Sequence, residues 1–385
     1  MTTRTLIPFS QAARLIWRGA SSVGVLLPLL IAPGARAAAG TPEDCAGDHP
    51  ILIRQTTRLN PACVYRTTLR IEAGNLELDC RNALILPGTR GPGIQVGGKV
   101  QGVSGVAIRH CRIRGGGNGV FIGLNEADNV KVARHDRETL YRITPHDITL
   151  DNVHVEDSRG VGIYVDDYAS RVKILNSRVE GAGSSGIYLE HSTREIEVRD
   201  SLLRGNGFGS FPVYRFGEAR REGLSIDSSA YNLVSGNRFE GNAAGGIFLY
   251  KNCQEHIHTK PYSVPRWQGS DHNNILGNTF LNEKVGVWIA SRQSRDLSSW
   301  DCGDKPYLGD SHYPDFARHN RVTGNRFEGG GTGVRVEDDD NLLEDNTFVD
   351  VANPIELGAD LRRQVTGKPL TGVVIRGNRT RPGKE

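Results

Sequence analysis

Charged and polar side chains follow each of a series of short aliphatic stretches, and these are the residues best able to carry chemistry. They are Asp166 and Asp167, Glu190 and His191, Asp227 and Ser228, Tyr250 and Lys251, Ser291 and Arg292, and Glu337 and Asp338. A base with a tuned pKa, set beside a cation, removes a weakly acidic proton and stabilises the negative charge that develops. These side chains can act together only if the fold brings the aliphatic stretches side by side.

The aliphatic stretches are copies of one tetrad. Six copies begin at Gly162, Gly186, Gly223, Gly246, Gly286 and Gly333, and they read GIYV, GIYL, GLSI, GIFL, GVWI and GVRV. The second and fourth residues are aliphatic while the third varies, which is the alternation of a strand with one buried face. Successive copies begin 24, 37, 23, 40 and 47 residues apart. The pattern therefore predicts a repeat of one short coil, enlarged by insertions in some copies.

A second repeat has the form Asn-x-Phe. It begins at Asn237, Asn278, Asn325 and Asn346, and Asn378 stands in a related position. Stacked Asn side chains can hydrogen-bond along a stack, and Phe rings in neighbouring coils can stack on one another. Each coil buries its apolar face only against its neighbours. We therefore predict an all-β fold, a single-stranded right-handed parallel β-helix (a solenoid) with long loops over one face.

Composition agrees with this fold class and divides the chain. The sequence has 47 Gly and one Met, so helix should be scarce. Arg4, Arg14 and Arg18 precede an apolar run over 23–32 and then small residues. That order is typical of a secretory signal peptide, predicted at 1–37, although an N-terminal membrane anchor is an alternative. A cap over 38–70 and the β-helix over 71–385 would follow.

Export changes the meaning of the net charge. The full chain carries +3, and removal of the four arginines within 1–37 leaves about −1. A mature chain of that charge does not suit a nucleic-acid partner. We expect a periplasmic or secreted monomer that does not associate with a membrane after signal cleavage.

Cysteine usage agrees with an oxidising compartment. The six cysteines fall into three near pairs, namely Cys45 with Cys63, Cys80 with Cys111, and Cys253 with Cys302. We expect three disulfides, although spacing alone does not fix their connectivity. No CxxC spacing occurs, so a cysteine metal site is not indicated.

Three insertions, over 204–221, 253–272 and 293–318, should form the walls of a cleft beside the tetrads. Aromatic faces stack on sugar rings and cations pair with carboxylates, so a basic and aromatic cleft suits an acidic polysaccharide. The alternative is that the loops are merely polar and cover the coils. The residues expected to bind substrate are Tyr164, Tyr188, Asp227, Trp288, Arg215, Arg266, Trp267 and Arg295.

The tetrads and the Asn-x-Phe steps resemble the β-helix repeats of carbohydrate-active proteins over about 70–380. That group includes β-helical polysaccharide lyases and periplasmic mannuronan C5-epimerases. The resemblance implies C5-proton abstraction from a uronate residue, with Lys251 as base, Arg292 as charge neutraliser or acid, and His191 or Tyr250 as another proton carrier. It also makes Glu190 and Asp227 candidate Ca²⁺ ligands. Pro145-His146-Asp147 is similar to the epimerase signature, but Thr144 stands where that signature has Asp.

Two other functions remain open. Glycoside hydrolysis needs two carboxylates about 5 to 10 Å apart, and Asp166, Glu190 and Asp227 are candidates. Asp166-Asp167 with His191 approximates the arrangement of a polygalacturonase. A non-catalytic glycan-binding scaffold for polysaccharide export is the other possibility.

Overall fold

A computed structural model describes residues 43–45, 49–125, 135–209, 220–260, 263, 265–358 and 360–383. All of them belong to one compact unit, Pro42–Glu385. The signal peptide predicted at 1–37 lies outside the described residues and stays a prediction. No helix in the described ranges is long and apolar enough to cross a membrane.

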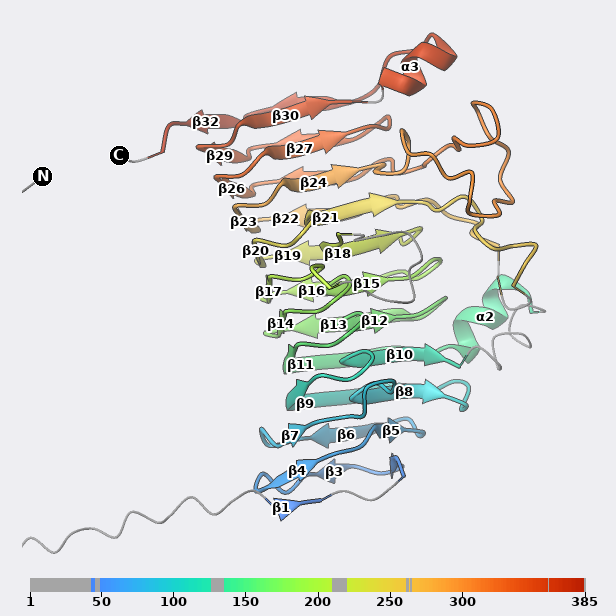
Figure 1. Ribbon diagram of the computed structural model, residues 1–385, viewed down its shortest axis with the longest axis vertical. Coiled ribbons are helices and arrows are strands. Elements are labelled where there is room, and N and C mark those ends of the chain that lie inside the picture. Colours follow the sequence, from blue (N-terminus) through green and yellow to red (C-terminus); the bar gives the residue numbers. More distant parts are fainter. Residues whose placement is uncertain are drawn as a thin grey trace, which may run out of the picture. The chain divides into compact units, whose positions relative to one another are not determined.

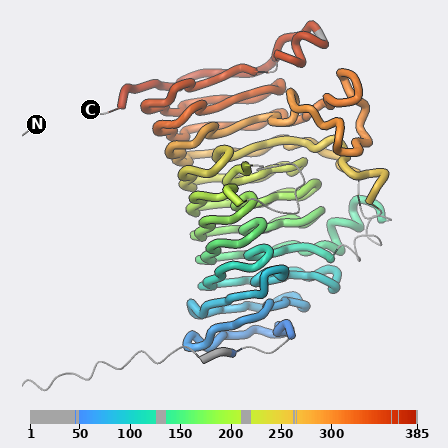
Figure 2. Tube along the Cα trace, viewed as in Figure 1, coloured from blue at the N-terminus to red at the C-terminus, as the bar shows by residue number. Residues whose placement is uncertain are grey.

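Parallel strands stack in successive coils (Figure 1, Figure 2). One face is an 11-stranded parallel sheet, here called the tetrad sheet. In order, its strands are β2 (Ile51–Ile53), β5 (Leu69–Ile71), β8 (Ile94–Gly98), β10 (Val120–Leu124), β12 (Ile163–Val165), β15 (Ile187–Leu189), β18 (Glu222–Asp227), β21 (Gly245–Tyr250), β24 (Val285–Ile289), β27 (Thr332–Val336) and β30 (Asn353–Leu357). Each strand pairs in parallel with the equivalent strand of the next coil, so the fold is a parallel β-helix.

The remaining strands form two further faces within one 21-stranded sheet. The first row is β3 (Thr57–Arg58), β6 (Leu76–Asp79), β9 (Ser104–Arg114), β11 (His146–Glu156), β13 (Ser170–Leu175), β16 (Glu197–Arg199), β19 (Leu233–Ser235), β22 (Asn274–Leu276), β25 (Arg321–Thr323), β28 (Leu342–Glu344) and β31 (Val374–Arg376). The second is β1 (Glu43–Asp44), β4 (Cys63–Tyr65), β7 (Leu84–Ile85), β14 (Arg178–Glu180), β17 (Leu202–Arg204), β20 (Arg238–Glu240), β23 (Thr279–Leu281), β26 (Arg326–Glu328), β29 (Thr347–Val349) and β32 (Arg379–Arg381). The long strands β9 and β11 pair with both rows and join them into one sheet.

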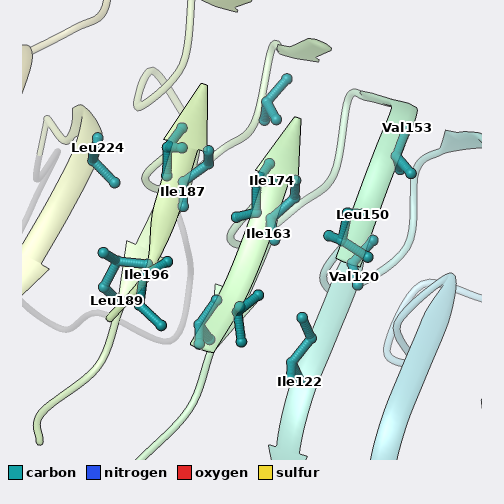
Figure 3. Close-up of a cluster of buried hydrophobic side chains, with 14 of the residues drawn as sticks. Val120, Ile122, Leu150, Val153, Ile163, Ile174, Ile187, Leu189, Ile196 and Leu224 are labelled. Atoms are coloured by element: carbon teal, nitrogen blue, oxygen red, sulfur yellow. The ribbon is translucent and has the colours of Figure 1, made fainter. Parts of the chain in front are cut away.

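The six tetrads occupy equivalent positions in the tetrad sheet, as the sequence predicts. Ile163 pairs with Ile187, and Ile187 pairs with Leu224. These aliphatic side chains are fully buried and point into the coil (Figure 3). The glycine that opens each tetrad is required by close backbone approach. A Cβ at Gly162 would lie 2.5 Å from the carbonyl oxygen of Gly186, and a Cβ at Gly246 would meet Phe280 and the next coil.

The Asn and Phe ladders are also confirmed. Each Asn in the series Asn237, Asn278, Asn325, Asn346 and Asn378 donates its side-chain amide to the next at 2.9 to 3.0 Å. The rings of Phe239, Phe280, Phe327 and Phe348 stack at centroid distances of 4.6 to 5.0 Å. A second Asn ladder, which the sequence analysis did not identify, joins Asn232, Asn273, Asn320 and Asn341. Buried amides of this kind satisfy the backbone at the corners of each coil.

A carboxyl group ends a third, shorter ladder. The Asn206 amide donates to Asn242, and the Asn242 amide donates to Glu283 Oε1 at 2.7 Å. Glu283 is 3% exposed, and burial raises its pKa to about 8. The folded chain therefore holds this proton more tightly than the unfolded chain does. As pH rises from about 4.5 towards 8, the unfolded state is the first to lose the proton, so this group destabilises the fold progressively.

Glu283→Gln should remove that pH dependence. Glutamine does not ionise and still accepts the Asn242 amide, so near pH 8 the variant should be about 4 kcal/mol more stable than the wild type. Near pH 5, where the wild-type carboxyl is protonated in the folded state, the difference should shrink to less than about 1 kcal/mol. Thermal unfolding at both pH values measures this. Equal stabilities near pH 8 would show that Glu283 is not held as a neutral acid.

Three disulfides join the near pairs of the sequence: Cys45–Cys63, Cys80–Cys111 and Cys253–Cys302. The expectation of scarce helix is confirmed, since the described residues contain only α2 (Arg137–Ile143) and α3 (Asp360–Thr366). Strands β1 to β4 already pair within the parallel rows, so coiling begins inside the segment 38–70 that the sequence assigns to a cap.

Candidate active site

Three carboxylates stand at equivalent places in neighbouring coils of the tetrad sheet. Asp166 follows β12, Glu190 follows β15, and Asp227 ends β18. Val165 pairs with Leu189, and Leu189 pairs with Ile226, so the three acids are one coil apart. Neighbouring strands lie about 4.8 Å apart. The repeat has thus assembled an acidic row that no single stretch of sequence contains.

Tyr164 and Tyr188 stand in the same coils and orient these acids. The Tyr164 hydroxyl donates to Glu190 Oε2 at 2.5 Å, and the Tyr188 hydroxyl donates to Asp227 Oδ2 at 2.9 Å. Their rings stack on each other at 5.5 Å, and Phe121 stacks on Tyr164 at 5.6 Å. The two hydroxyls are therefore engaged by the carboxylates, and the Arg221 guanidinium lies 5.6 Å from the centre of the Tyr188 ring.

Arg266 reaches the acidic row from the loop that follows β21. Its guanidinium hydrogen-bonds Asp227 Oδ1 and Glu255 Oε1, both at 2.7 Å, and Glu190 Oε1 at 3.4 Å. Asn252 donates to Asp227 at 2.8 Å and to Glu255 at 3.1 Å. Asp227 is fully buried and Arg266 is 5% exposed. The sequence names Arg266 and Asp227 as substrate-binding residues, and the structure shows them bound to each other.

Burial and neighbouring charges shift the pKa values of two neighbouring acids, Glu190 and Asp227, in opposite directions. Burial and, next to it, the charge of Asp227 raise the pKa of Glu190, Arg266 lowers it, and the net pKa is about 7. Burial would also raise the pKa of Asp227, but the guanidinium of Arg266 and the nearby His191 outweigh it and hold that pKa below its usual range. One carboxyl of the pair is therefore readily protonated at neutral pH while the other is ionised, a division typical of acid and base roles.

A pocket of about 470 Å³ opens over this row. Among its lining residues are Phe121, Tyr164, Asp166, Asp167, Glu190, His191, Glu255, His256, Lys260 and Arg266. His191 Nε2 lies 3.0 Å from Asp167 Oδ1. Carboxyls, two imidazoles and an ammonium thus line one pocket, which suits proton transfer to and from a bound substrate.

Glu190, Asp227 and Glu255 form an acidic cluster whose carboxylate oxygens are possible ligands of a calcium ion. One oxygen from each of Glu190, Asp227 and Glu255 lies within 4.8 Å of the other two, and carboxylate oxygens are the ligands that Ca²⁺ prefers. The Arg266 guanidinium, however, already bonds to all three acids and supplies positive charge there. Ca²⁺ does not fit this cluster while Arg266 keeps its position.

Calcium binding should therefore appear only when Arg266 is removed. A chelator should leave the thermal midpoint of the wild type unchanged, whereas added Ca²⁺ should raise the midpoint of Arg266→Ala, because the ion then replaces the lost guanidinium. Thermal unfolding with chelator and with Ca²⁺ measures both effects. A wild-type midpoint that falls in chelator, with no such fall in Asp227→Asn, would place Ca²⁺ in this cluster.

Three arginines gather one coil further along, where Tyr250 pairs with Asp227. Arg221 donates to the Tyr250 hydroxyl at 2.9 Å, and the Arg292 guanidinium lies 3.7 Å from the centre of the Tyr250 ring. Partial desolvation, together with the charges of Arg292 and Arg221, lowers the pKa of Arg295. Glu222, 3.3 Å from Arg221, is the acid beside this cluster. Within the described ranges Arg292 and Arg295 form no ion pair.

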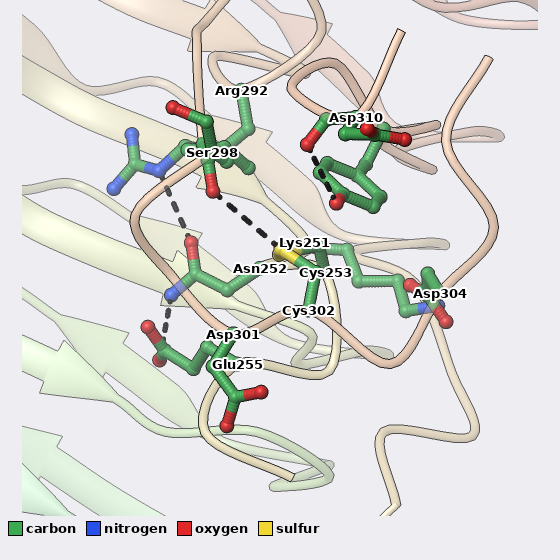
Figure 4. The surroundings of a disulfide bond; sticks show 12 residues. Lys251, Asn252, Cys253, Glu255, Arg292, Ser298, Asp301, Cys302, Asp304 and Asp310 are labelled. Carbon is green, nitrogen blue, oxygen red and sulfur yellow. Dashed lines mark hydrogen bonds and ion pairs between the residues drawn. A yellow bond between two sulfur atoms is a disulfide. The ribbon is translucent and has the colours of Figure 1, made fainter. Parts of the chain in front are cut away.

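The side chains of Lys251 and Arg292 bind different partners, although the sequence predicts that they lie on one face. Their backbone N–H groups donate to the two oxygens of Asp315, at 2.5 and 2.7 Å, so the two turns are adjacent. The Lys251 ammonium then pairs with Asp304 at 2.8 Å, while Arg292 turns to Asn252 Oδ1 at 3.1 Å (Figure 4). Lys251 lines a different pocket from Glu190.

The other predicted binding residues are dispersed. Trp288 donates to Glu337 at 3.2 Å, and Arg335 covers its ring at 4.6 Å. Trp267 lines the same second pocket as Lys251. Arg215 lies outside the described residues. Tyr250 is fully buried, beneath Arg292. The predicted disulfide Cys253–Cys302 does join the two long loops, as expected (Figure 4).

Glu255, Asn252 and Glu222 were given no role from the sequence, and Arg221 was placed only within the cleft insertion 204–221. Arg221 and Glu222 directly precede a tetrad, and Asn252 and Glu255 follow Lys251 by one and four residues. Their closeness to the tetrads in the sequence could have identified them as site residues. Their contacts with one another could not be predicted, because these contacts depend on how two loops fold over the sheet.

Comparison with known proteins agrees with the architecture. The family described as "Right handed beta helix region" matches residues 92–260. The catalytic domain of a GH87 α-1,3-glucanase in complex with nigerose superposes with a TM-score of 0.52 and 10% identity, over 86% of this chain. The chain spans 62% of that domain's length. A PL6 family polysaccharide lyase from Pseudopedobacter saltans superposes with a TM-score of 0.51 and 9% identity, over 88% of this chain and 86% of the lyase.

No protein with a curated description matches the sequence significantly. The identities to the two solved structures are too low to transfer an activity, so what they establish is the fold. The chain is a right-handed parallel β-helix protein, and it shares that fold with carbohydrate-active enzymes of more than one reaction class.

Proposed function

We propose that the protein hydrolyses glycosidic bonds of an acidic, uronate-containing polysaccharide in the pocket around Glu190. The observation that carries the proposal is that Glu190, with a pKa of about 7, lines the same pocket as Asp166 and Asp167. A protonated carboxyl and a second carboxylate facing one space are the minimal equipment for glycoside hydrolysis.

In this mechanism Glu190 is the general acid. It gives its proton to the glycosidic oxygen as the bond between that oxygen and the anomeric carbon breaks. A water molecule adds to the anomeric carbon, and Asp166 or Asp167 takes the proton that this water loses. His191, 3.0 Å from Asp167, keeps that carboxylate oriented. Arg266 and Asp227 position Glu190 and do not react.

The arginine cluster supports an acidic substrate. Arg292 and Arg295 form no ion pair within the described residues, and Glu222 is the acid beside Arg221. A uronate carboxylate would supply the missing charge through paired N–H···O bonds. Because Asp227 and Tyr250 pair across neighbouring coils, a glycan that crosses the coils would contact both the acidic pocket and the arginines.

The same arginines favour a second candidate, C5-proton abstraction by a lyase or a C5-epimerase. A carboxylate held by Arg221 and Arg292 would have its C5 proton acidified. His191 would accept that proton, or the Tyr250 hydroxyl would accept it while passing its own proton to Glu222, which lies 3.2 Å away. Elimination of the 4-linked sugar gives an unsaturated uronate, while return of a proton to the other face gives the epimer. Lys251 has no assigned step in either candidate.

Activity should follow the protonation of Glu190. Hydrolysis needs the protonated form, which is lost as pH rises through about 7, so kcat should be highest on the acidic side of that value and fall tenfold per pH unit well above it. A pH profile of kcat on the cleaved polysaccharide measures this. A kcat that rises through pH 7 would assign Glu190 the role of a base.

A product assay separates the candidates. The mature chain is incubated with alginate, pectate and glycosaminoglycans. New reducing ends without ultraviolet absorbance of unsaturated uronate support hydrolysis; that absorbance supports a lyase, and deuterium uptake at C5 without cleavage supports an epimerase. Binding without any of these signals would leave a glycan-binding scaffold, and the proposed hydrolysis would be wrong.

A further inference from the structure

A second pocket lies behind the loop that carries Arg266. Its volume is about 450 Å³, and Tyr231, Lys251, Trp267, Gln268, Phe316 and Arg318 are among its lining residues. Arg266 lines the pocket around Glu190, whereas the next residue, Trp267, lines the second pocket. The loop is thus a wall with one pocket on each side, and neither candidate mechanism uses the second pocket.

Three aromatic side chains of this pocket are exposed and held in place. Tyr231 is 56% exposed, Phe316 40% and Trp267 37%. The Tyr231 ring stacks on His272 at 4.9 Å, and the Arg137 guanidinium lies 4.0 Å from the centre of the Trp267 ring. Rigid aromatic rings that remain accessible around a hollow are typical of binding sites for amphipathic ligands such as sugar rings.

Gln268 gives an independent sign of a ligand. It is 7% exposed, and its Nε2 donates to the carbonyl oxygens of Thr193 and Ser228, both at 2.8 Å. These two bonds fix the amide, and Oε1 then has no hydrogen-bond partner among the described residues. A buried acceptor without a donor is costly, and a ligand hydroxyl would satisfy it.

Cations border the same pocket. The Lys251 ammonium and the Arg318 guanidinium each lie 5.6 Å from the centre of the Phe316 ring. Their acid partners, Asp304 for Lys251 and Asp338 for Arg318, are not among the residues that line the pocket. The pocket therefore presents aromatic faces, an unsatisfied acceptor and two cations to one ligand, and the carboxyl of Asp271 also lines it.

We propose that this pocket is a non-catalytic subsite that binds one sugar residue of the acidic polysaccharide. The sugar ring packs against Trp267 or Phe316, a hydroxyl donates to Gln268 Oε1, and Lys251 and Arg318 attract the carboxylate. The identity of the ligand rests on the proposed function. A second subsite across the wall from the catalytic pocket would give long chains an affinity that short fragments lack.

The test measures binding to pectate and alginate, as polymers and as short fragments, in a Glu190→Gln chain that does not turn over. Adding Trp267→Ala and Phe316→Ala together should weaken binding of the preferred polymer roughly tenfold and leave binding of short fragments that fill only the catalytic pocket unchanged. Trp267→Phe should retain most of the affinity, and Leu52→Ala, which removes exposed apolar surface in the first coils, should have no effect. Thermal unfolding confirms that each variant is folded.

The outcomes separate the two proposals. If the parent binds the polymer and the double variant binds it equally well, this subsite is wrong while the proposed function stands. If the parent binds no acidic polysaccharide at all, the proposed function fails, and the assignment of this ligand fails with it.

Discussion

Replacing Glu190 with glutamine should lower kcat on the cleaved polysaccharide by about one hundred- to ten-thousand-fold. Glutamine keeps the size of the side chain and can still accept the Tyr164 hydroxyl, which lies 2.5 Å from Glu190 Oε2. It has no proton to give to the leaving oxygen. Because the loss falls on the chemical step, KM should change by less than about threefold. Steady-state kinetics on the identified polysaccharide measures both constants.

Glu337→Gln is the matched control. Glu337 follows the aliphatic pair of its coil as Glu190 does, is fully buried, and accepts from Trp288 at 3.2 Å, but it is not part of the catalytic pocket. It should retain kcat within about twofold. Equal losses in the two variants would mean that the effect is structural, and full activity in Glu190→Gln would remove Glu190 from the mechanism.

Replacing Arg266 with methionine should lower the free energy of unfolding by about 3 to 5 kcal/mol at neutral pH, since one partner of a buried ion pair is lost. Asp227, which is fully buried, would keep Tyr188 and Asn252 but lose its 2.7 Å bond to the Arg266 guanidinium. Chemical denaturation at pH 7 measures the change, with Arg376→Met as control. Arg376 pairs with Glu344 on the surface, and that exposed pair should contribute less than about 1 kcal/mol.

The difference in free energy of unfolding between wild type and Arg266→Met should become smaller at acidic pH. The pKa of Asp227 is lowered in the folded wild type, so its ion pair stabilises the fold above the pKa of the unfolded chain and is lost as pH falls through the folded pKa. Wild type and variant should therefore converge below about pH 4. A deficit that is the same at pH 7 and in acid would mean that Arg266 acts through packing alone.

The fold was predictable because its determinants are local and repeat. A Gly opens each of six tetrads, two aliphatic residues two positions apart follow it, and Asn-x-Phe recurs at a corner in four coils. Each has one physical reason: close backbone approach at Gly162, core packing at Ile163, and amide stacking at Asn237. Repetition makes such a signal readable from one sequence.

The site was predictable only up to the ends of the strands. The alternation that places Glu190 and Asp227 outside the core also aligns them across coils. Beyond the strand ends, turns redirect the chain: Ser228 and Ala290 have φ of 49° and 62°, and Asp315 binds the backbone of Lys251 from 64 residues away. For that reason no local sequence pattern predicted that the side chains of Lys251 and Arg292 point apart. None predicted that Arg266 binds the acids either.

The mass of the cleavage products tests the central claim most directly. Products released from the preferred acidic polysaccharide in water enriched in heavy oxygen are analysed at once by mass spectrometry. Hydrolysis predicts that each cleavage adds one water, with the heavy oxygen at the new reducing end, and that Glu190→Gln forms almost none of this product. Products that lack the added water and carry an unsaturated uronate would contradict hydrolysis and establish elimination in its place.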